Sequence, residues 1–296
     1  MAFMRKGQIT LVTIITVLVF LGCTTADTPY FESSKDRLRI GTYNVQNLFD
    51  DVDDPHKADE GQTTPERLSD LASVIISVDC DVLALQEVEN IETLRAFNEL
   101  YLGNLYQEIV LVEGNDPRGI DVAVMAKFPI ENVISYRDRE IPDITEDRTI
   151  RFSRDLLVVQ WSDRAGNTWN LLTTHLKSGT TSADRLRRTA QAREIASICR
   201  EDGYISTMGN GYVILAGDLN AEPWSGDLGA LSGVPFSDPA RDLPYRMTHA
   251  SGKVLDYILL SPDADCRYIV GSYKIYKEYS AEDASDHYLI YLDLEY

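Results

Sequence analysis

Polar side chains that could hydrolyse a phosphoester are concentrated where strand-like segments begin or end. They lie in Tyr43-Asn44, Gln86-Glu87, Thr174-His175, Gly217-Asp218-Leu219-Asn220 and Ser285-Asp286-His287, and Asp256 sits inside the strand-like segment 254–260. Cleavage of a phosphoester requires an activated water, stabilisation of the charge that develops on the phosphoryl oxygens, and neutralisation of the leaving group. Because strand ends on one side of a sheet converge, we expect these segments to form one site.

The residue types in these segments favour a hard divalent cation as the cofactor. Carboxylate and amide oxygens suit Mg²⁺ or Mn²⁺, which retain several waters, so a glutamate such as Glu87 can bind one without a dedicated cage. A histidine can polarise a phosphoryl oxygen or transfer a proton, because its pKa lies near neutrality. A carboxylate held against that histidine would fix its tautomer.

Each of these residues, taken alone, also has a structural interpretation. Asp218 and Asn220 could form a turn after a strand. Glu87 could be a solvated strand end, and His175 could be a buried structural histidine. Asp256 has apolar neighbours and needs a partner, which a structural pair could also supply. Only the ordered set as a whole favours a catalytic site.

Several cations near these segments are candidates for phosphate binding. Lys177 follows His175 by two residues, and Arg118 lies at the entry to a predicted strand. A second group before another strand consists of Arg148, Arg151 and Arg154. A solvated surface position is the alternative for each of these cations. A solvated helix face is expected for Arg185, Arg187, Arg188 and Arg193.

The segments that must position these residues alternate between strand-like and helix-like patterns. Strands are predicted at 38–45, 81–86, 106–113, 120–126, 130–136, 155–161, 168–174, 212–216, 254–260, 273–276 and 288–294. One helix should start at Thr64, with proline at the first helical position, and another should run from a Ser182 cap to about Cys199. Because the central strands are apolar almost throughout, we expect sheets covered on both faces, in one α/β domain.

The length and charge of the chain limit the classes of protein to which it can belong. Its 296 residues are 44% hydrophobic and 25% charged, which suits a large globular domain and excludes a disordered composition. The net charge of −19 opposes long-range attraction to nucleic acid or anionic lipid. A polyanionic substrate stays compatible with this charge, because bound cations can invert the field at a site.

The first 36 residues have the pattern of an export signal and a tether. Arg5 and Lys6 precede an apolar run of 14 residues, which is short for a transmembrane helix but typical of a secretory signal. We expect a signal peptide at 1–22, a lipidated Cys23 as in bacterial lipoproteins, and a tether within 23–36. The protein would then be anchored to the bacterial cell envelope; plain secretion and a retained anchor are the alternatives. Processing would change the net charge from −19 to −21.

The remaining cysteines do not suggest a disulfide or zinc framework. Cys80, Cys199 and Cys266 are odd in number and widely spaced, without a CxxC pair. We expect them to be small buried hydrophobic residues.

The ordered motifs resemble the endonuclease/exonuclease/phosphatase superfamily, which includes pancreatic-type deoxyribonuclease, abasic-site endonucleases, inositol polyphosphate 5-phosphatases and bacterial sphingomyelinases. The resemblance rests on Thr42-Tyr43-Asn44-Val45, Leu85-Gln86-Glu87-Val88, Gly217-Asp218-Leu219-Asn220, Leu255-Asp256-Tyr257 and Ser285-Asp286-His287. It implies a four-layer α/β sandwich with two central mixed β-sheets flanked by helices, and a catalytic domain at 37–296.

The resemblance also implies roles for the motif residues. Asn44 and Glu87 would help to hold the metal, with Glu87 as the principal ligand. Asp286 would contribute to metal or water binding. Asp218 would orient or deprotonate the attacking water, and Asn220 would assist at the scissile phosphate.

Two histidines complete the implied site. Asp256 would hydrogen-bond His287, which would stabilise the pentacoordinate phosphorus. His175 stands where deoxyribonuclease-like members keep a second histidine, proposed as the proton donor to the leaving group. Abasic-site enzymes generally lack that histidine, so the resemblance and the export signal both argue against base-excision repair.

Three hypotheses for the function follow. The first is an exported nuclease that cleaves DNA or RNA with Mg²⁺, with Mn²⁺ or Ca²⁺ as alternatives. The second is a phosphatase or a sphingomyelinase-like phosphodiesterase acting on lipid or small phosphate esters, and the third is a non-catalytic surface binding protein. The implied partners are nucleic acid as substrate and the lipid bilayer through the anchor, with no obligate protein partner.

Overall fold

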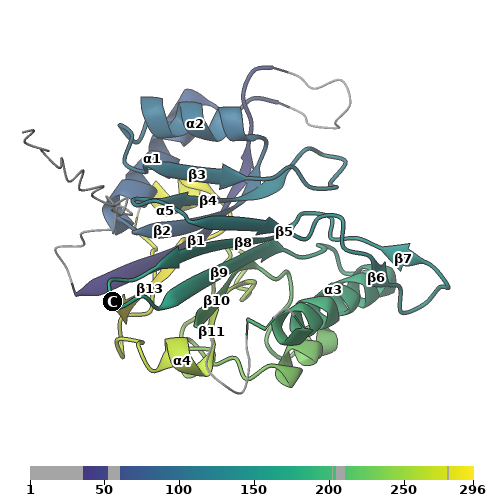
Figure 1. Cartoon of the computed structure of the whole chain (residues 1–296). Coiled ribbons are helices and arrows are strands. Elements are labelled where there is room, and N and C mark those ends of the chain that lie inside the picture. The colour runs from purple at the N-terminus through teal and green to yellow at the C-terminus, as the bar shows by residue number, and fades with distance from the viewer. Residues whose placement is uncertain (1–35, 53–60, 202, 205–210, 279) are drawn as a thin grey trace, which may run out of the picture.

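Two mixed β-sheets pack face to face at the centre of the molecule (Figure 1). The structure is a computed structural model, and it describes residues 36–52, 61–201, 203–204, 211–278 and 280–296. The predicted signal peptide, Cys23 and the tether up to residue 35 therefore lie outside the described residues, as does most of the acidic loop after Asp50.

The first sheet has six strands and contains the first two motifs. In spatial order they are β12 (Lys274–Ile275), β13 (Ile290–Glu295), β1 (Arg37–Leu48), β2 (Val82–Val88), β4 (Asp121–Ala126) and β3 (Glu108–Leu111). The neighbours β1 and β2 are parallel, and every other pair is antiparallel. Parallel pairing brings the carboxyl ends of β1 and β2, with their polar residues, to the same edge.

The second sheet has five strands and contains the next motifs. In spatial order they are β11 (Asp256–Leu260), β10 (Tyr212–Asp218), β9 (Thr168–His175), β8 (Leu156–Ser162) and β5 (Asn132–Ser135). Only β9 and β10 are parallel. The predicted hairpin turn at 163–167 joins β8 to β9, and Asp163 N donates to Asn167 O at 3.0 Å. A separate two-stranded ribbon pairs β6 (Ile141–Pro142) with β7 (Thr149–Ile150).

Helices cover the outer face of each sheet and complete four layers. The six-stranded sheet is covered by α1 (Pro65–Val78), α2 (Ile91–Leu100) and α5 (Ser280–Ala284), and the five-stranded sheet by α3 (Ser182–Glu201) and the 3₁₀ segment η1 (Gly226–Gly233). A short helix, α4 (Pro262–Asp265), follows β11.

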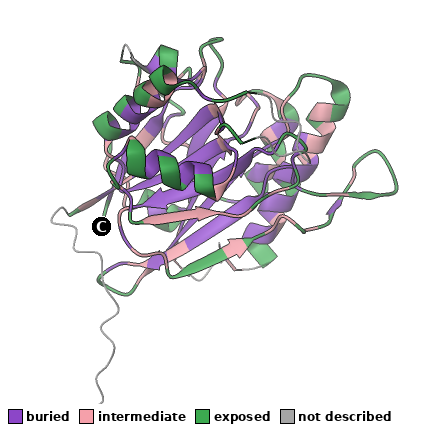
Figure 2. Ribbon diagram, turned by 90° about the horizontal axis from the view of Figure 1, so that it is seen from above, coloured by how far each residue is buried: buried purple, intermediate pink, exposed green. Residues whose placement is uncertain are grey.

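Three hydrophobic clusters hold these layers together. One lies between the sheets, and two lie beneath the helices. In Figure 2 the strands are largely buried and the helices expose their outer faces. The predicted α/β sandwich with sheets covered on both faces is therefore confirmed.

The helix starts agree only partly with the sequence prediction. Thr64 caps α1, since its hydroxyl accepts from Arg67 N, and proline occupies the first turn as predicted. The prediction that Ser182 caps the second helix was wrong. Ser182 is the first residue of α3, and the residue before it, Thr181, is the cap. The Thr181 hydroxyl accepts from Asp184 N at 3.2 Å, and Asp184 Oδ2 accepts from Thr181 N at 3.3 Å, a reciprocal arrangement like a capping box. Helix α2, capped by Asn90, was not predicted.

The strand predicted at 130–136 is shorter than expected, since β5 spans only Asn132–Ser135, and it pairs with β8 in the five-stranded sheet. The expectation for the cysteines needs one correction. Cys80 and Cys199 are buried as expected, but Cys266 is exposed at the end of α4. Among the described residues, no helix is long and apolar enough to cross a membrane.

Candidate active site

The strand register places most of the motif residues at one common edge of the two sheets. Parallel pairing aligns Asn44 on β1 with Gln86 on β2, and His175 on β9 with Asp218 on β10. Antiparallel pairing then sets Asp218 opposite Asp256, the first residue of β11. The segments predicted to form one site are therefore neighbours.

Asn44 connects the two sheets at this edge. Its side-chain Nδ2 donates to Glu87 Oε1 at 3.3 Å in its own sheet and to Asp218 Oδ2 at 3.1 Å in the other. Its Oδ1 accepts from Gln46 N at 2.9 Å. Glu87 has φ 64°, at an irregularity in the pairing of β2. Such an irregularity in a strand re-aims a side chain, and here the Glu87 carboxylate meets Asn44.

Asp218 and Asn220 form a turn at the end of β10, and their side chains contact each other there. Asp218 Oδ1 accepts from Asn220 N at 2.8 Å, and Asp218 Oδ2 accepts from Asn220 Nδ2 at 3.1 Å. Asn220 Nδ2 also donates to Leu176 O at 3.2 Å. The structural interpretation of these two residues as a turn is thus correct, and the turn itself points both side chains at the site.

His287 is held by Asp256 as the motif pattern predicted. The His287 Nδ1 lies 2.9 Å and 3.1 Å from the two Asp256 oxygens, and its Nε2 lies 3.8 Å from Asp218 Oδ2. Burial alone would lower the pKa of His287, but the carboxylates of Asp256 and Asp218 outweigh it and raise that pKa to about 10. The ring is therefore an imidazolium at neutral pH.

His175 also contacts Asp218, but it is neutral, whereas His287 is protonated. Its Nε2 lies 3.3 Å from Asp218 Oδ2 and 3.9 Å from Glu87 Oε1, and its Nδ1 has no hydrogen-bond partner among the described residues. Burial, followed by the positive charge of Arg154, holds the pKa of His175 well below its usual value. His175 is therefore a neutral imidazole.

Asp218 is buried, and the positive charge of His287 does not fully offset the cost of burying its carboxylate. Burial raises its pKa to about 7, although the His287 imidazolium acts in the opposite direction. A cation placed beside this carboxylate would favour its ionised form.

Asp286 lies on the other side of His287. Its side chain is 42% exposed, and its Oδ2 is 3.4 Å from the Nε2 of His249. Its backbone N donates to Gln46 Oε1 at 3.0 Å, which ties this segment to the end of β1. The structure therefore brings Asp286 to the site, next to a histidine that the motifs did not include.

The predicted phosphate-binding cations approach the site, but each has an acidic partner. Arg118 Nε lies 3.4 Å from Asp116 Oδ1, and Lys177 Nζ lies 3.3 Å from Asp184 Oδ1. Both positive charges lower the pKa of His175, so both lie near enough to influence it.

Two further arginines are buried: Arg154, a candidate for phosphate binding, and Arg188, which was expected on a solvated helix face. Arg154 Nε lies 3.0 Å from Asp116 Oδ2, and the positive charge of this side chain acts on His175. Arg188 is also buried, and pairs with Asp227 at 2.5 Å. Its prediction as part of a solvated face was therefore wrong, whereas Arg185 and Arg193 are exposed. The acidic partner Asp227 belongs to η1, which packs against α3, and the sequence of α3 carries no signal for this contact.

Arg67 is a structural residue of the site that the sequence did not reveal. From α1 its guanidinium donates to the carbonyls of Val45, Gln46 and Asn47, and at 2.9 Å to Ala284 O. It therefore joins the end of β1 to the segment that leads to His287. An arginine at a helix position carries no signal for such bonds, because the carbonyls belong to distant segments.

The donor set fits a hard divalent cation. Glu87 and Asp286 each offer carboxylate oxygens. Burial raises the pKa of Asp218, and a nearby cation would favour its ionised form. Two clusters that include histidine also bring ligand atoms within 4.8 Å of one another: His249 with Asp286 and His287, and Asp218 with Asp256 and His287. The His287 ring is protonated on both nitrogens, however, and His249 Nδ1 accepts from Ser251 N at 2.9 Å. Glu87 and Asp286 are therefore the carboxylates available to hold such an ion, and Asn44 contacts Glu87.

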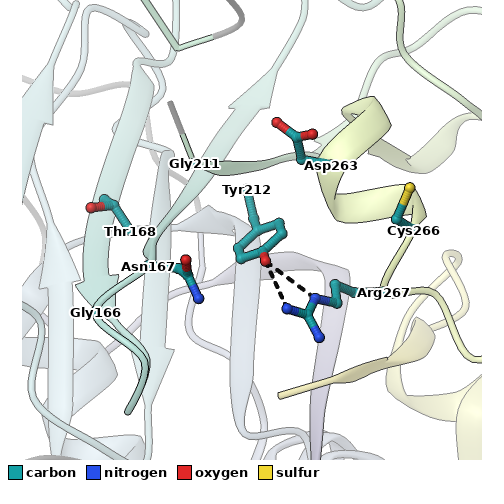
Figure 3. A pocket seen from close by; sticks show the side chains of 8 residues that line it. All are labelled: Gly166, Asn167, Thr168, Gly211, Tyr212, Asp263, Cys266 and Arg267. Atoms are coloured by element: carbon teal, nitrogen blue, oxygen red, sulfur yellow. Dashed lines mark hydrogen bonds between the residues drawn. The ribbon is translucent and has the colours of Figure 1, made fainter. Parts of the chain in front are cut away.

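Two cavities differ in their relation to this site. One of about 410 Å³ adjoins Asn220 and is also lined by the exposed Trp224 and Lys253. A larger one, of about 660 Å³, is lined by Thr168 and Tyr212 at the other ends of β9 and β10 (Figure 3). There Arg267 donates to the Tyr212 hydroxyl at 3.0 and 3.2 Å. Of these two cavities, only the smaller one adjoins a predicted site residue.

The stacked mixed sheets and the histidine–carboxylate cluster at their shared edge define a phosphoesterase-type α/β sandwich. The chain belongs to the Endonuclease/Exonuclease/phosphatase family, whose sequence model matches residues 41–287. Members of this family are hydrolases that act on phosphoester bonds. A comparison with curated proteins finds no match.

Solved structures confirm the fold. The human Nocturnin catalytic domain is similar with a TM-score of 0.61 and 18% identity, over 88% of this chain and 94% of that one. An endonuclease/exonuclease/phosphatase from Bacteroides vulgatus has a TM-score of 0.61 and 16% identity, over 88% and 99% of the two chains. A Beutenbergia cavernae protein of the same description has a TM-score of 0.60 and 18% identity, over 88% and 72%.

Proposed function

We propose that this protein is an exported, divalent-metal-dependent nuclease that hydrolyses DNA or RNA phosphodiesters. The observation that carries the proposal is the position of Asp218. Its Oδ2 lies 3.3 Å from His175, 3.8 Å from His287 and 3.1 Å from Asn44. A carboxylate, a neutral imidazole and an imidazolium therefore converge where a phosphodiester can be attacked.

Each residue has a distinct task in the proposed reaction. A Mg²⁺ or Mn²⁺ ion held by Glu87 and Asp286 would supply positive charge to the phosphoryl oxygens. Asp218 orients the attacking water and accepts its proton. The His287 imidazolium, fixed by Asp256, donates its Nε2 hydrogen to the negative charge that develops on phosphorus oxygens.

The remaining residues orient the reactants and assist the leaving group. His175 is neutral and lies against Asp218, so we assign it a hydrogen bond to the leaving oxygen, which takes up the proton that Asp218 accepted from the water. Asn220 Nδ2, which already contacts Asp218 Oδ2, is placed to contact the scissile phosphate. Arg118 and Lys177 bind flanking phosphates after exchange of their acidic partners.

The place of action in this proposal follows from the N-terminal segment. Cleavage before Cys23 and lipidation of that cysteine would hold the catalytic domain on the cell envelope, with nucleic acid as substrate and the bilayer as the other partner. No obligate protein partner is required.

A smaller substrate is the second candidate. The cavity of about 410 Å³ beside Asn220 is of the size that accepts a small ligand. Its Trp224 and Lys253 are exposed, and an indole with an ammonium group suits a lipid headgroup or a small phosphate ester. The acidic net charge also favours a substrate with few negative charges.

Hydrolysis assays distinguish these candidates. The purified protein is incubated with plasmid DNA, RNA, sphingomyelin and small phosphate esters, with Mg²⁺, Mn²⁺, Ca²⁺ or EDTA. The nuclease proposal predicts cleavage of nucleic acid that EDTA abolishes and His287→Ala reduces by at least about 100-fold. Metal-independent activity, or full activity of His287→Ala, contradicts the site; cleavage of sphingomyelin or small esters alone supports the second candidate.

A further inference from the structure

His249 lies against His287, and the proposed reaction leaves it without a task. A tight turn holds it: the backbone N of Thr248 and of His249 both donate to Lys253 O, at 2.9 and 3.1 Å. The turn is bonded to the catalytic segment, since Ala250 N donates to Asp286 O at 2.8 Å and Tyr288 N to Thr248 O at 2.7 Å. The backbone therefore fixes where the His249 ring stands.

The protonation pattern of the neutral His249 ring follows from its neighbours. Ser251 N donates to His249 Nδ1 at 2.9 Å, and a backbone N–H can only donate. Nδ1 therefore carries the lone pair, and Nε2 carries the hydrogen. That Nε2 lies 3.4 Å from Asp286 Oδ2. His249 thus presents a hydrogen-bond donor, and not a metal ligand, to the Asp286 carboxylate.

The surroundings of Asp286 show why such a donor matters. Its side chain is 42% exposed, whereas that of His249 is only 20% exposed. The His249 ring packs edge-to-face on His287, with 4.6 Å between the ring centres. One rigid histidine therefore contacts both an exposed carboxylate and the catalytic imidazolium.

We propose that His249 is a positioning residue that holds the Asp286 carboxylate in the orientation for metal binding. The inference rests on the proposed function, because Asp286 is a ligand only in that reaction. Hydrogen bonds from a partner outside the ligand set typically contribute about 10- to 100-fold to metal affinity. The contribution of His249 should appear in metal affinity, while kcat at saturating metal stays close to that of the wild type.

Two substitutions separate the hydrogen bond from the packing. His249→Phe keeps an aromatic ring against His287 and removes the N–H donor. His249→Gln loses the ring but retains an N–H donor of similar reach. Isothermal titration of the purified protein with Mn²⁺ should show affinity weakened about 10- to 100-fold in His249→Phe and by less than about 3-fold in His249→Gln. Asp286→Asn supplies the reference, and His249→Phe should weaken Mn²⁺ binding no further in that background.

The outcomes distinguish this inference from the proposed function. Equal Mn²⁺ affinity in the wild type, His249→Phe and His249→Gln overturns the positioning role and leaves the nuclease proposal intact. Equal weakening in both variants, or additivity with Asp286→Asn, assigns the effect to packing and also overturns it. A wild-type protein that neither binds Mn²⁺ nor hydrolyses any ester overturns both. Thermal unfolding of each variant shows whether a folding defect is the cause of a weakened affinity. If His249→Phe does not fold, His249→Gln still tests whether the donor is sufficient.

Discussion

His175 and His287 show how two residues of one type acquire different chemistry from their neighbours. Both are buried and both contact Asp218, and burial lowers the pKa of each. His287 also faces Asp256, so its pKa rises to about 10. His175 instead lies near Arg154, Arg118 and Lys177, and its pKa falls further. His287 is therefore the residue with a proton to donate near neutral pH.

Removal of the Asp256 charge should move the alkaline limit of activity. In Asp256→Asn the pKa of His287 falls from about 10 toward its ordinary value of 6.5, because the negative charge that raises this pKa most is lost. The imidazolium then persists only at lower pH, so activity at pH 8–9 should fall about 10- to 100-fold, with a smaller loss at pH 6. The pH profile of kcat and an NMR titration of His287 measure both effects.

Asp263 offers the matched control for this substitution. It is exposed on α4, so Asp263→Asn removes the same charge without contact to a histidine. An unchanged His287 pKa in Asp256→Asn would contradict the electrostatic account.

The residue types were predictable from the sequence, but their charge states were not. Asp218, Asp256 and His287 were identified as one set, and the structure brings them together. Arg67 and His249 were missed because their partners are backbone carbonyls or a carboxylate from distant segments. Charge state depends on burial and on cations such as Arg154, which no local pattern reveals.

At the level of strands, Gly217 permits the close approach of β9 and β10 beside Asp218, the proposed base. Its φ is 148°, and a Cβ at this position would lie 2.1 Å from Thr174 O. Gly217→Ala should therefore lower the free energy of unfolding by about 2–4 kcal/mol and displace the following carboxylate. Gly229→Ala is the control, because no atom lies within 4 Å of its added Cβ. Denaturant unfolding and kcat of both variants test this; equal stability would contradict it.

At the level of helices, Arg67 on α1 is hydrogen-bonded to two parts of the site, the end of β1 and the segment before Ser285. Arg67→Met retains the length of the stem but loses the donors to four carbonyls, so stability should fall by about 2–4 kcal/mol. Activity should fall as well, because the end of β1 and the segment before Ser285 lose their common support. Arg95→Met on α2, an exposed position, should stay within about 0.5 kcal/mol of the wild type. Chemical denaturation of the pair measures the difference.

The elements that a sequence pattern shows best are those with a repeated apolar face. The strands that carry the motifs were predicted close to their observed bounds. The assignment of β5 to the second sheet was not predictable, because pairing across sheets leaves no local signal. Helix α2 was missed because it is short, only ten residues, and its cap Asn90 follows a strand directly.

At the scale of the whole molecule, the order of the motifs along the chain predicted the four layers through the family resemblance. The net charge of the molecule constrains its substrate. The 28 basic residues are outnumbered by 47 acidic ones, and the cations near the site are already paired. This composition therefore opposes long-range attraction of a long polyanion. A nuclease of this kind must bind nucleic acid through few phosphate contacts and the metal.

Salt dependence measures that number of contacts directly. Two contacts, from Arg118 and Lys177, correspond to a loss of about 10-fold in kcat/KM for plasmid DNA between 50 and 200 mM monovalent salt at fixed Mg²⁺, whereas six to ten contacts would lose about 10³- to 10⁵-fold. Arg118→Ala and Lys177→Ala should each reduce the logarithmic slope by about 0.9. A neutral surface substitution, Gly229→Ala, should leave it unchanged. A loss above about 10³-fold would show that more cations bind the substrate than the charge distribution allows.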